Sequence, residues 1–218
     1  MERYHGGVSD PRAEVVRAGY ATVARAYREA LIDELAAKPL DRAFLDAFAE
    51  RSGRGLCVDI GCGPGQVARY LQGRGATVEG IDLSPAMIDE ARATHEGIPF
   101  RVGDMFALPY AGASITGIVA FYAIVHLRSD ELLAPFREFF RVLVPGGLAA
   151  VAFHAGSDTV HVDELFGCAT SLDFMFHRPE VVAGALALAG FTIEARLDRE
   201  PYPGAEHPSQ RTYLLARK

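Results

Sequence analysis

Three glycines at every second position follow shortly after an acidic residue, and this spacing can bind a ligand through main-chain atoms. Gly61, Gly63 and Gly65 come after Asp59 and before a helical pattern that begins at Gln66. Glycine adopts positive φ without strain and leaves no side chain in a turn, so a ligand can lie directly against the backbone. The pattern predicts a strand, a tight turn and a helix that together bind a flat, polar molecule.

A second acidic residue stands at the distance along the chain that a ribose would require. Asp82 closes the apolar segment 77–82 and lies 21 positions after Gly61. In nucleoside-binding α/β folds, a carboxylate about 20 residues beyond the glycine turn hydrogen-bonds the ribose hydroxyls. We therefore expect the turn and Asp82 to bind a nucleoside together.

The charge beside the turn indicates which nucleoside this is. Dinucleotide sites place a pyrophosphate on the helix N-terminus and usually have the spacing G-x-G-x-x-G, whereas the spacing here is G-x-G-x-G. Asp59 would repel a phosphate and attract a cation. An NAD-dependent oxidoreductase remains an alternative, but it usually carries a catalytic Tyr-x-x-x-Lys, and this chain contains none.

The turn resembles motif I of the class I S-adenosylmethionine-dependent methyltransferases. Residues 80–88 look like motif II of that family, residues 102–105 like its adenine-binding acidic turn, and residues 141–147 like the segment before its fifth strand. The resemblance implies S-adenosylmethionine as the cofactor, a cationic ligand without phosphate. The cofactor-binding residues that it implies are Asp59, Gly61, Cys62, Gly63, Gly65, Asp82, Leu83, Met87, Asp104, Met105 and Phe121.

Strands and helices must alternate to position these residues. With 218 residues, half of them hydrophobic, the chain can bury the core of one α/β domain. We expect strands near 55–60, 77–82, 98–102, 115–121 and 147–154, and helices near 64–73, 84–94 and 130–142. Pro135 should begin the main part of the last helix, and Pro145-Gly146-Gly147 should stop it. The resemblance implies a Rossmann-like, doubly wound, seven-stranded and mostly parallel sheet with an antiparallel last strand, formed with the segments 191–199 and 211–217.

A single methyltransferase domain over residues 1–218 is expected to have four parts. These are an N-terminal helical lid (1–50), a cofactor-binding core (51–154), a substrate cap that looks like an inserted loop (155–177), and a C-terminal helix and hairpin (178–218). In the lid, Tyr20 and Tyr27 share one apolar helical face. They either pack in the core or face the ligand, where Tyr20 could contact the reacting groups.

Two histidines follow the predicted strands at the edge where open α/β sheets bind ligands. His154 ends the fifth strand, and His126 follows the fourth. Methyl transfer needs a general base only when the acceptor must lose a proton, and a histidine suits that role. His154 is the first candidate and His126 the second, although either could be a hydrogen-bonded structural residue.

The acceptor is predicted to be a small molecule. The fourth strand ends in Phe121-Tyr122-Ala123-Ile124 and lacks the Asn/Asp-Pro-Pro-Tyr signature of family members that methylate nucleobases or amides. Aromatic residues in the cap favour a planar, apolar acceptor methylated at oxygen, nitrogen or an indole carbon. The chain is similar to small actinobacterial methyltransferases of secondary metabolism, and a non-catalytic S-adenosylmethionine-binding protein is the alternative. Candidate acceptor contacts are Tyr27, Tyr122, His161, Phe174, Phe176 and His177.

Composition disfavours several other partners. The net charge is −6 and the basic residues are scattered, so nucleic acid is not expected to bind. Residues 1–7 lack the apolar core of a signal peptide and no apolar stretch is long enough to span a bilayer, which favours a cytoplasmic protein without membrane contact. Cys57, Cys62 and Cys168 lack metal-ligand spacing, so no metal site is predicted. The sequence does not indicate an oligomeric state.

Overall fold

Seven strands form one sheet in the computed structural model, which describes residues 11–204 and 206–218. The predicted absence of a signal peptide in residues 1–7 lies outside these residues. The strand order is β3-β2-β1-β4-β5-β9-β8, and β9 runs antiparallel to both of its neighbours while the other pairs are parallel. This confirms the predicted Rossmann-like sheet with an antiparallel last strand. The strands are β1 (Leu56–Ile60), β2 (Thr77–Asp82), β3 (Phe100–Val102), β4 (Ile115–Phe121), β5 (Leu143–Ala155), β8 (Thr192–Arg199) and β9 (Gln210–Arg217).

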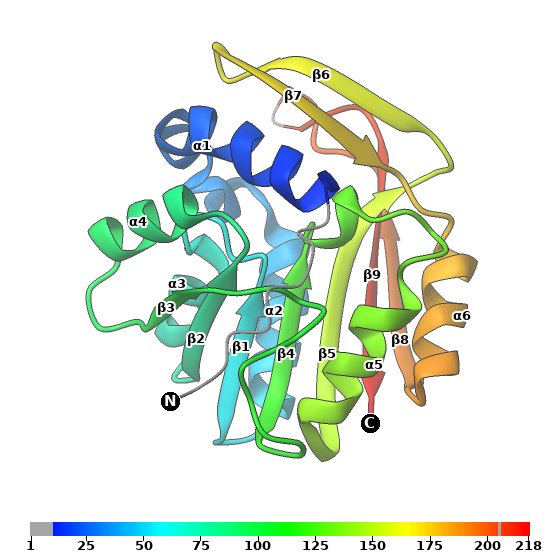
Figure 1. Ribbon diagram of the computed structural model, residues 1–218. Helices are drawn as coiled ribbons and strands as arrows, with labels where there is room; N and C mark the ends of the chain where they lie inside the picture. Colours follow the sequence, from blue (N-terminus) through cyan, green and yellow to red (C-terminus); the bar gives the residue numbers. More distant parts are fainter. Residues whose placement is uncertain (1–10, 205) are drawn as a thin grey trace.

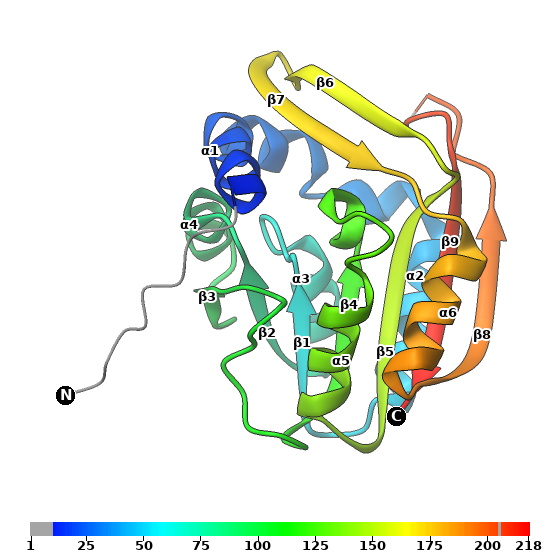
Figure 2. The same ribbon diagram turned by 45° about the vertical axis from the view of Figure 1, so that its right-hand side comes forward.

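Helices cover both faces of the sheet. Helices α5 and α6 lie on one face and α2 and α3 on the other (Figures 1 and 2). Among the described residues, no helix combines the length and the apolar character that a membrane span needs. The helices are α1 (Pro11–Leu31), α2 (Pro39–Arg51), α3 (Gln66–Gly73), α4 (Pro85–Thr94), α5 (Leu133–Val142) and α6 (Pro179–Ala189), with short 3-10 turns η1 (Glu34–Ala37) and η2 (Ile124–His126).

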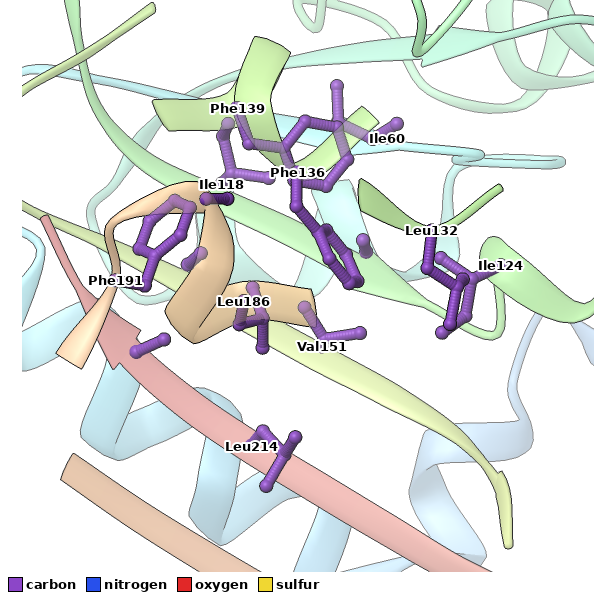
Figure 3. Packing of buried hydrophobic residues seen from close by; sticks show 14 of the residues in the cluster. Ile60, Ile118, Ile124, Leu132, Phe136, Phe139, Val151, Leu186, Phe191 and Leu214 are labelled. Carbon is purple, nitrogen blue, oxygen red and sulfur yellow. The ribbon is translucent and has the colours of Figure 1, made fainter. Parts of the chain in front are cut away.

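Each face of the sheet has its own buried cluster. Figure 3 shows the cluster under α5 and α6, where Phe136 and Phe139 pack near Ile118 of β4, and Leu186 lies near Val151 of β5. The opposite face buries apolar side chains of α2, α3 and α4 against the same strands. Because both faces are covered, the carboxyl ends of the parallel strands are where a ligand can reach the sheet.

The two prolines near helix starts behave differently from one another. Ser84 caps α4 by accepting a hydrogen bond from the Met87 amide, and Pro85 is the first helical residue, so the helix starts close to the predicted range of 84–94. The expectation that the main part of α5 begins at Pro135 is wrong, because the helix begins at Leu133. Pro135 is tolerated in the first turn, since amides there have no intrahelical partner. The helix ends at Val142, before the Pro-Gly-Gly segment, which belongs to β5.

The predicted cap is a β-hairpin and not an irregular loop. Strands β6 (Thr159–Leu165) and β7 (Cys168–Met175) pair antiparallel, and Phe166 and Gly167 form the turn between them, both at positive φ. Two central residues at positive φ give the turn that matches the twist of paired strands. The mixture of polar and aromatic residues in this segment concealed the alternation of a strand.

Helix α1 and the hairpin lie together across the carboxyl ends of the strands (Figures 1 and 2). The Thr22 hydroxyl donates to the Ala169 carbonyl at 3.0 Å, and the Thr170 hydroxyl donates to the Gly19 carbonyl at 3.1 Å. A Cβ at Gly19 would lie 2.5 Å from a methyl carbon of Leu172, so glycine permits this close approach. The helix and the hairpin therefore form one packed cover over the sheet edge.

Candidate active site

A cavity of about 580 Å³ lies beneath this cover. Its walls come from α1, the glycine turn, the ends of β2, β4 and β5, the hairpin, and the loop before β9. Most of the predicted site residues meet there. They are Gly61, Cys62, Gly63, Asp82, Leu83, Met87, Asp104, Met105 and Phe121 of the predicted cofactor site, and Tyr20, Tyr27, Tyr122, His126, His154 and Phe174 of the predicted catalytic and acceptor sites.

The three glycines of the turn are needed for different reasons. All three have positive φ. A Cβ at Gly61 would lie 2.6 Å from Ala123, and one at Gly65 would lie 2.7 Å from the Phe100 ring, so these two glycines permit close packing. A Cβ at Gly63 would meet only the Tyr27 ring, at 3.9 Å, and Gly63 lines the cavity. Gly65, a predicted cofactor residue, does not line the cavity.

Asp59 also lies away from the cavity, contrary to its prediction as a cofactor-binding residue. It is 1% exposed, and its Oδ2 accepts a hydrogen bond from the Ala68 amide at 3.0 Å. Burial raises its pKa to about 8. Asp59 precedes the last residue of β1 and its side chain turns towards α3, so it caps the first turn of that helix.

Asp82 is fixed at the edge of the cavity by main-chain donors. Its Oδ2 accepts from the Gly63 amide and its Oδ1 accepts from the Ser84 amide, both at 2.8 Å. Burial raises its pKa, and these amides act in the opposite direction. Each carboxylate oxygen can accept more than one hydrogen bond. The carboxylate can therefore still accept bonds from a pair of hydroxyls on a ligand in the cavity.

Polar side-chain atoms near the turn suit a cation. Three main-chain amides in this region are already engaged, because Gly63 donates to Asp82, Gly65 donates to the Cys62 carbonyl, and Ala68 donates to Asp59. Gln66 lines the same part of the cavity, and its buried Oε1 has no hydrogen-bond partner among the described residues. The Gln66 Nε2 donates to Glu34, which also lines the cavity. Both side chains offer acceptors to a positively charged group.

His126 connects the cover to the sheet edge. Its Nδ1 lies 2.7 Å from the Asp173 carbonyl of β7, and because a carbonyl only accepts, Nδ1 carries the proton. Its Nε2 then accepts a hydrogen bond from the Tyr20 hydroxyl of α1 at 2.8 Å. Burial lowers the pKa of His126 to about 4. The imidazole is therefore neutral near pH 7, with both nitrogens engaged.

His154 faces the cavity from the end of β5. Its Nδ1 lies 2.8 Å from the Ser209 hydroxyl, and its ring stacks on Phe176 at 5.0 Å and contacts Tyr122 at 5.1 Å. Burial, together with the positive charge of Arg211, lowers its pKa to about 3. The ring is therefore neutral and only weakly basic.

A buried charged cluster at the same end of the cavity was not predicted. Arg199 donates to the Asp41 carboxylate at 2.9 Å and to Glu206 at 2.7 Å, and Lys38 lies 3.2 Å from Glu206. Lys38, Asp41 and Glu206 line the cavity. Residues 38–41 read as a break between helices in the sequence, and nothing there indicated that they meet residues far along the chain. The only feature of the sequence that pointed to this cluster was the presence of charged residues within the predicted strands 191–199 and 211–217.

Three predicted acceptor contacts lie outside the cavity. His161 of β6 is half exposed and bonds to Asp163 and Asp173. His177 is buried, and its Nε2 hydrogen-bonds the Ile124 carbonyl. This bond connects the segment that follows β7 to η2. Phe176 lies behind His154 and does not line the cavity. Phe166, at the tip of the hairpin, does line it, with its ring 5.5 Å from that of Tyr27.

Comparison with known proteins connects this geometry to a family. The family described as "Methyltransferase domain" matches residues 57–147. A malonyl-[acyl-carrier protein] O-methyltransferase from Enterobacter lignolyticus is 31% identical over 137 residues, which cover 63% of this chain and 52% of that protein. Methyltransferase GfsG from Streptomyces halstedii is 34% identical over 102 residues, which cover 44% of this chain and 36% of that protein. The chain thus spans about half, or less, of the length of these relatives.

A solved structure shares the whole fold. The 1,6-didemethyltoxoflavin-N1-methyltransferase of Burkholderia thailandensis has a TM-score of 0.73 at 21% identity, and the match covers 99% of this chain and 93% of that chain. The matched family segment contains the glycine turn, Asp82 and the two later motifs in the predicted order. In its motifs, in the matched family segment and in its fold, the chain is similar to the class I S-adenosylmethionine-dependent methyltransferases.

Proposed function

We propose that this protein binds S-adenosylmethionine in the cavity and transfers its methyl group to a small, planar acceptor. The observation that carries the proposal is the position of Asp82, a partly buried carboxylate held by the Gly63 and Ser84 amides beside a glycine turn. Asp82 would accept hydrogen bonds from the ribose hydroxyls. Gly63 would let the ligand pass close to the main chain.

The charges around the turn favour this cofactor over a dinucleotide. Gln66 and Glu34 would hold the ammonium group of the cofactor, since both side chains offer acceptor oxygens. Gln66 Oε1 accepts no hydrogen bond from any described residue. Three amides of the turn and of the helix that follows it are occupied by Asp82, Asp59 and a carbonyl. Fewer main-chain donors are therefore left for the pyrophosphate of NAD.

Aromatic side chains line the part of the cavity where the acceptor would bind. Tyr27, Tyr122, Phe166 and Phe174 supply ring surfaces, and the volume of about 580 Å³ lies within the usual range of small-molecule sites. These features support a planar acceptor that the cover shields from water. The Streptomyces relative supports the predicted similarity to actinobacterial methyltransferases.

The chemistry depends more on position than on acid–base groups. The bound cofactor would supply an electrophilic methyl group whose leaving group is a neutral thioether. The protein's part is to exclude water and to hold the acceptor atom in line with the methyl carbon. His154 remains the first candidate for a base, although its low pKa makes it a weak one.

Two measurements test the proposal. Calorimetry with S-adenosylmethionine and with NAD should show binding of the first alone, and tight NAD binding without binding of the methyl donor would overturn the assignment. Incubation with the donor and a panel of phenols, indoles and amines, followed by mass spectrometry, should show a gain of one methyl group. If the donor binds but no acceptor in the panel gains mass, a non-catalytic S-adenosylmethionine-binding protein becomes the better account.

A further inference from the structure

We propose that Tyr122 recognises a hydrogen-bond donor on the methyl acceptor, and that Tyr213 and Asp41 hold Tyr122 in this role. The inference rests on the proposed function and narrows the acceptor to molecules with an un-ionised O–H or N–H group at this point. A carboxylate, a phenolate or a fully alkylated atom would not bind there.

The direction of the hydrogen bonds around Tyr213 follows from its neighbours. The Tyr213 hydroxyl donates its one proton to Asp41 Oδ1 at 2.7 Å. The Arg199 Nε, which can only donate, lies 3.0 Å from the same hydroxyl. The Tyr122 hydroxyl lies 3.0 Å away as well. Because the proton of Tyr213 is already used, Tyr122 must donate to Tyr213.

Asp41 fixes this direction because it is an ionised acceptor. Burial raises its pKa, while the hydrogen bond from Tyr213 and the charge of Arg199 oppose that rise. Arg199 donates to Asp41 Oδ2 at 2.9 Å, so both carboxylate oxygens accept bonds. The Arg199 guanidinium beside it carries a permanent positive charge and favours the ionised carboxylate, so Oδ1 accepts from Tyr213. The chain of bonds therefore runs from Tyr122 through Tyr213 to Asp41.

Tyr122 consequently offers lone pairs, and no proton, to the cavity that it lines. It follows β4 directly, at the carboxyl edge of the sheet, and its main chain has φ of 55°, a conformation that is unusual for a bulky residue. Its amide donates to the Ala152 carbonyl at 2.7 Å, and its ring contacts His154. The surrounding structure thus holds a strained residue in one orientation, which is typical of a functional position.

Binding of a matched pair of probes tests this inference. The probes are 2-naphthol, which has an O–H group, and 2-methoxynaphthalene, which has the same ring system without one. Their dissociation constants are measured by calorimetry in the presence of saturating S-adenosylhomocysteine, for the unmodified protein and the variants Tyr122→Phe and Tyr213→Phe. Tyr70→Phe is the control, since Tyr70 donates to Asp46 on α2, outside the cavity.

We expect the unmodified protein and the Tyr70→Phe variant to prefer 2-naphthol by about three- to tenfold, the range of one neutral hydrogen bond. Tyr122→Phe should reduce this preference to about one. Tyr213→Phe should also reduce it, by freeing the Tyr122 proton to donate to the methyl ether. Equal binding of the two probes by the unmodified protein, or an unchanged preference in Tyr122→Phe, would overturn the inference.

The same experiment separates this inference from the proposed function. If S-adenosylhomocysteine does not bind, the proposed function fails first. If it binds and the preference does not depend on Tyr122, only the inference fails. Melting temperatures show whether each variant is folded, and if Tyr213→Phe does not fold, the comparison of Tyr122→Phe with Tyr70→Phe decides the outcome.

Discussion

The Tyr20 hydroxyl of α1 donates a hydrogen bond to His126 Nε2 at 2.8 Å. His126 also donates through Nδ1 to the Asp173 carbonyl of the hairpin. A histidine that the sequence marks as a candidate base therefore joins the two halves of the cover. Its position after β4 was predicted, but its hydrogen bonds give it a structural role that the position alone does not reveal.

Loss of the Tyr20 hydroxyl should weaken this connection. Tyr20→Phe would leave the buried Nε2 of His126 without a donor, at a cost of about 1–3 kcal/mol in the free energy of unfolding. Urea denaturation measures the change. Tyr27→Phe, on the same helix face, is the matched control and should cost less, because Tyr27 contacts Tyr20 and Phe166 through its ring. Equal losses in the two variants would argue against the hydrogen bond as the cause.

The two acidic residues near the turn should differ in their effect on cofactor binding. Asp82→Ala removes a charged acceptor on the cavity wall and should weaken S-adenosylmethionine binding by roughly 1–3 kcal/mol. Asp59→Asn keeps an oxygen for the Ala68 amide and lies off the cavity, so binding should not change. Calorimetry on both variants checks this. A loss for Asp59→Asn as large as that for Asp82→Ala would restore Asp59 as a ligand residue.

The stability of the Asp59→Asn variant should also depend on pH. The pKa of Asp59 is about 8 in the folded protein, against an ordinary value of 3.8. A raised carboxyl pKa means that the folded state holds a proton which the unfolded state releases, so wild-type stability falls as pH rises from about 4 to about 8. Asparagine has no such dependence. Urea denaturation should therefore show the variant gaining stability relative to wild type across this range, and a constant difference would contradict the raised pKa.

Asp82 and Asp59 show which features of the site can be predicted from the sequence and which cannot. The glycine turn and Asp82 were predictable because local spacing determines them, and so were the strands around them. The position of the Asp59 side chain off the cavity, on the Ala68 amide, was not predictable, because residues on a strand alternate between faces and the sequence did not reveal which face belongs to α3. Asp41 and Arg199 are 158 positions apart, and only the folded sheet brings them together.

The rate of methyl transfer should not fall near pH 6.5, where a histidine of ordinary pKa would become protonated. Burial lowers the pKa of His126 to about 4 and that of His154 to about 3. Both rings stay neutral as pH falls through 6.5, the usual value for histidine, so their protonation should not reduce kcat/KM between pH 7 and about pH 5. Rates of His154→Gln and wild type over this range, with an acceptor from the methylation screen, provide the check. A limb near 6.5 that vanishes in His154→Gln would show a base of ordinary pKa.

The buried cluster around Arg199 should be the costliest charged group to disrupt. The Arg199 side chain is 4% exposed and bonds to Asp41 and Glu206, so Arg199→Met would remove the cation bonded to Asp41 and one of the cations around Glu206, at a cost of about 3–5 kcal/mol. Arg196→Met, on the same strand, is the control. Arg196 is 40% exposed and pairs with surface carboxylates, so water can replace it and the loss should be far smaller.

Acid should reduce the difference between Arg199→Met and wild type. Burial alone would raise the pKa of Glu206, but the hydrogen bonds from Arg199 and the Tyr202 amide and the charges of Lys38 and Arg211 together outweigh it and hold the value at about 2. A lowered carboxyl pKa stabilises the fold above the ordinary value of 4.5, and this contribution is lost as pH falls towards 2. Without Arg199 the pKa of Glu206 should rise and the contribution should become smaller. Urea denaturation near pH 7 and near pH 4 measures the difference in the free energy of unfolding between wild type and Arg199→Met. This difference should be smaller at pH 4. If it is the same at both pH values, the loss comes from packing and not from charge.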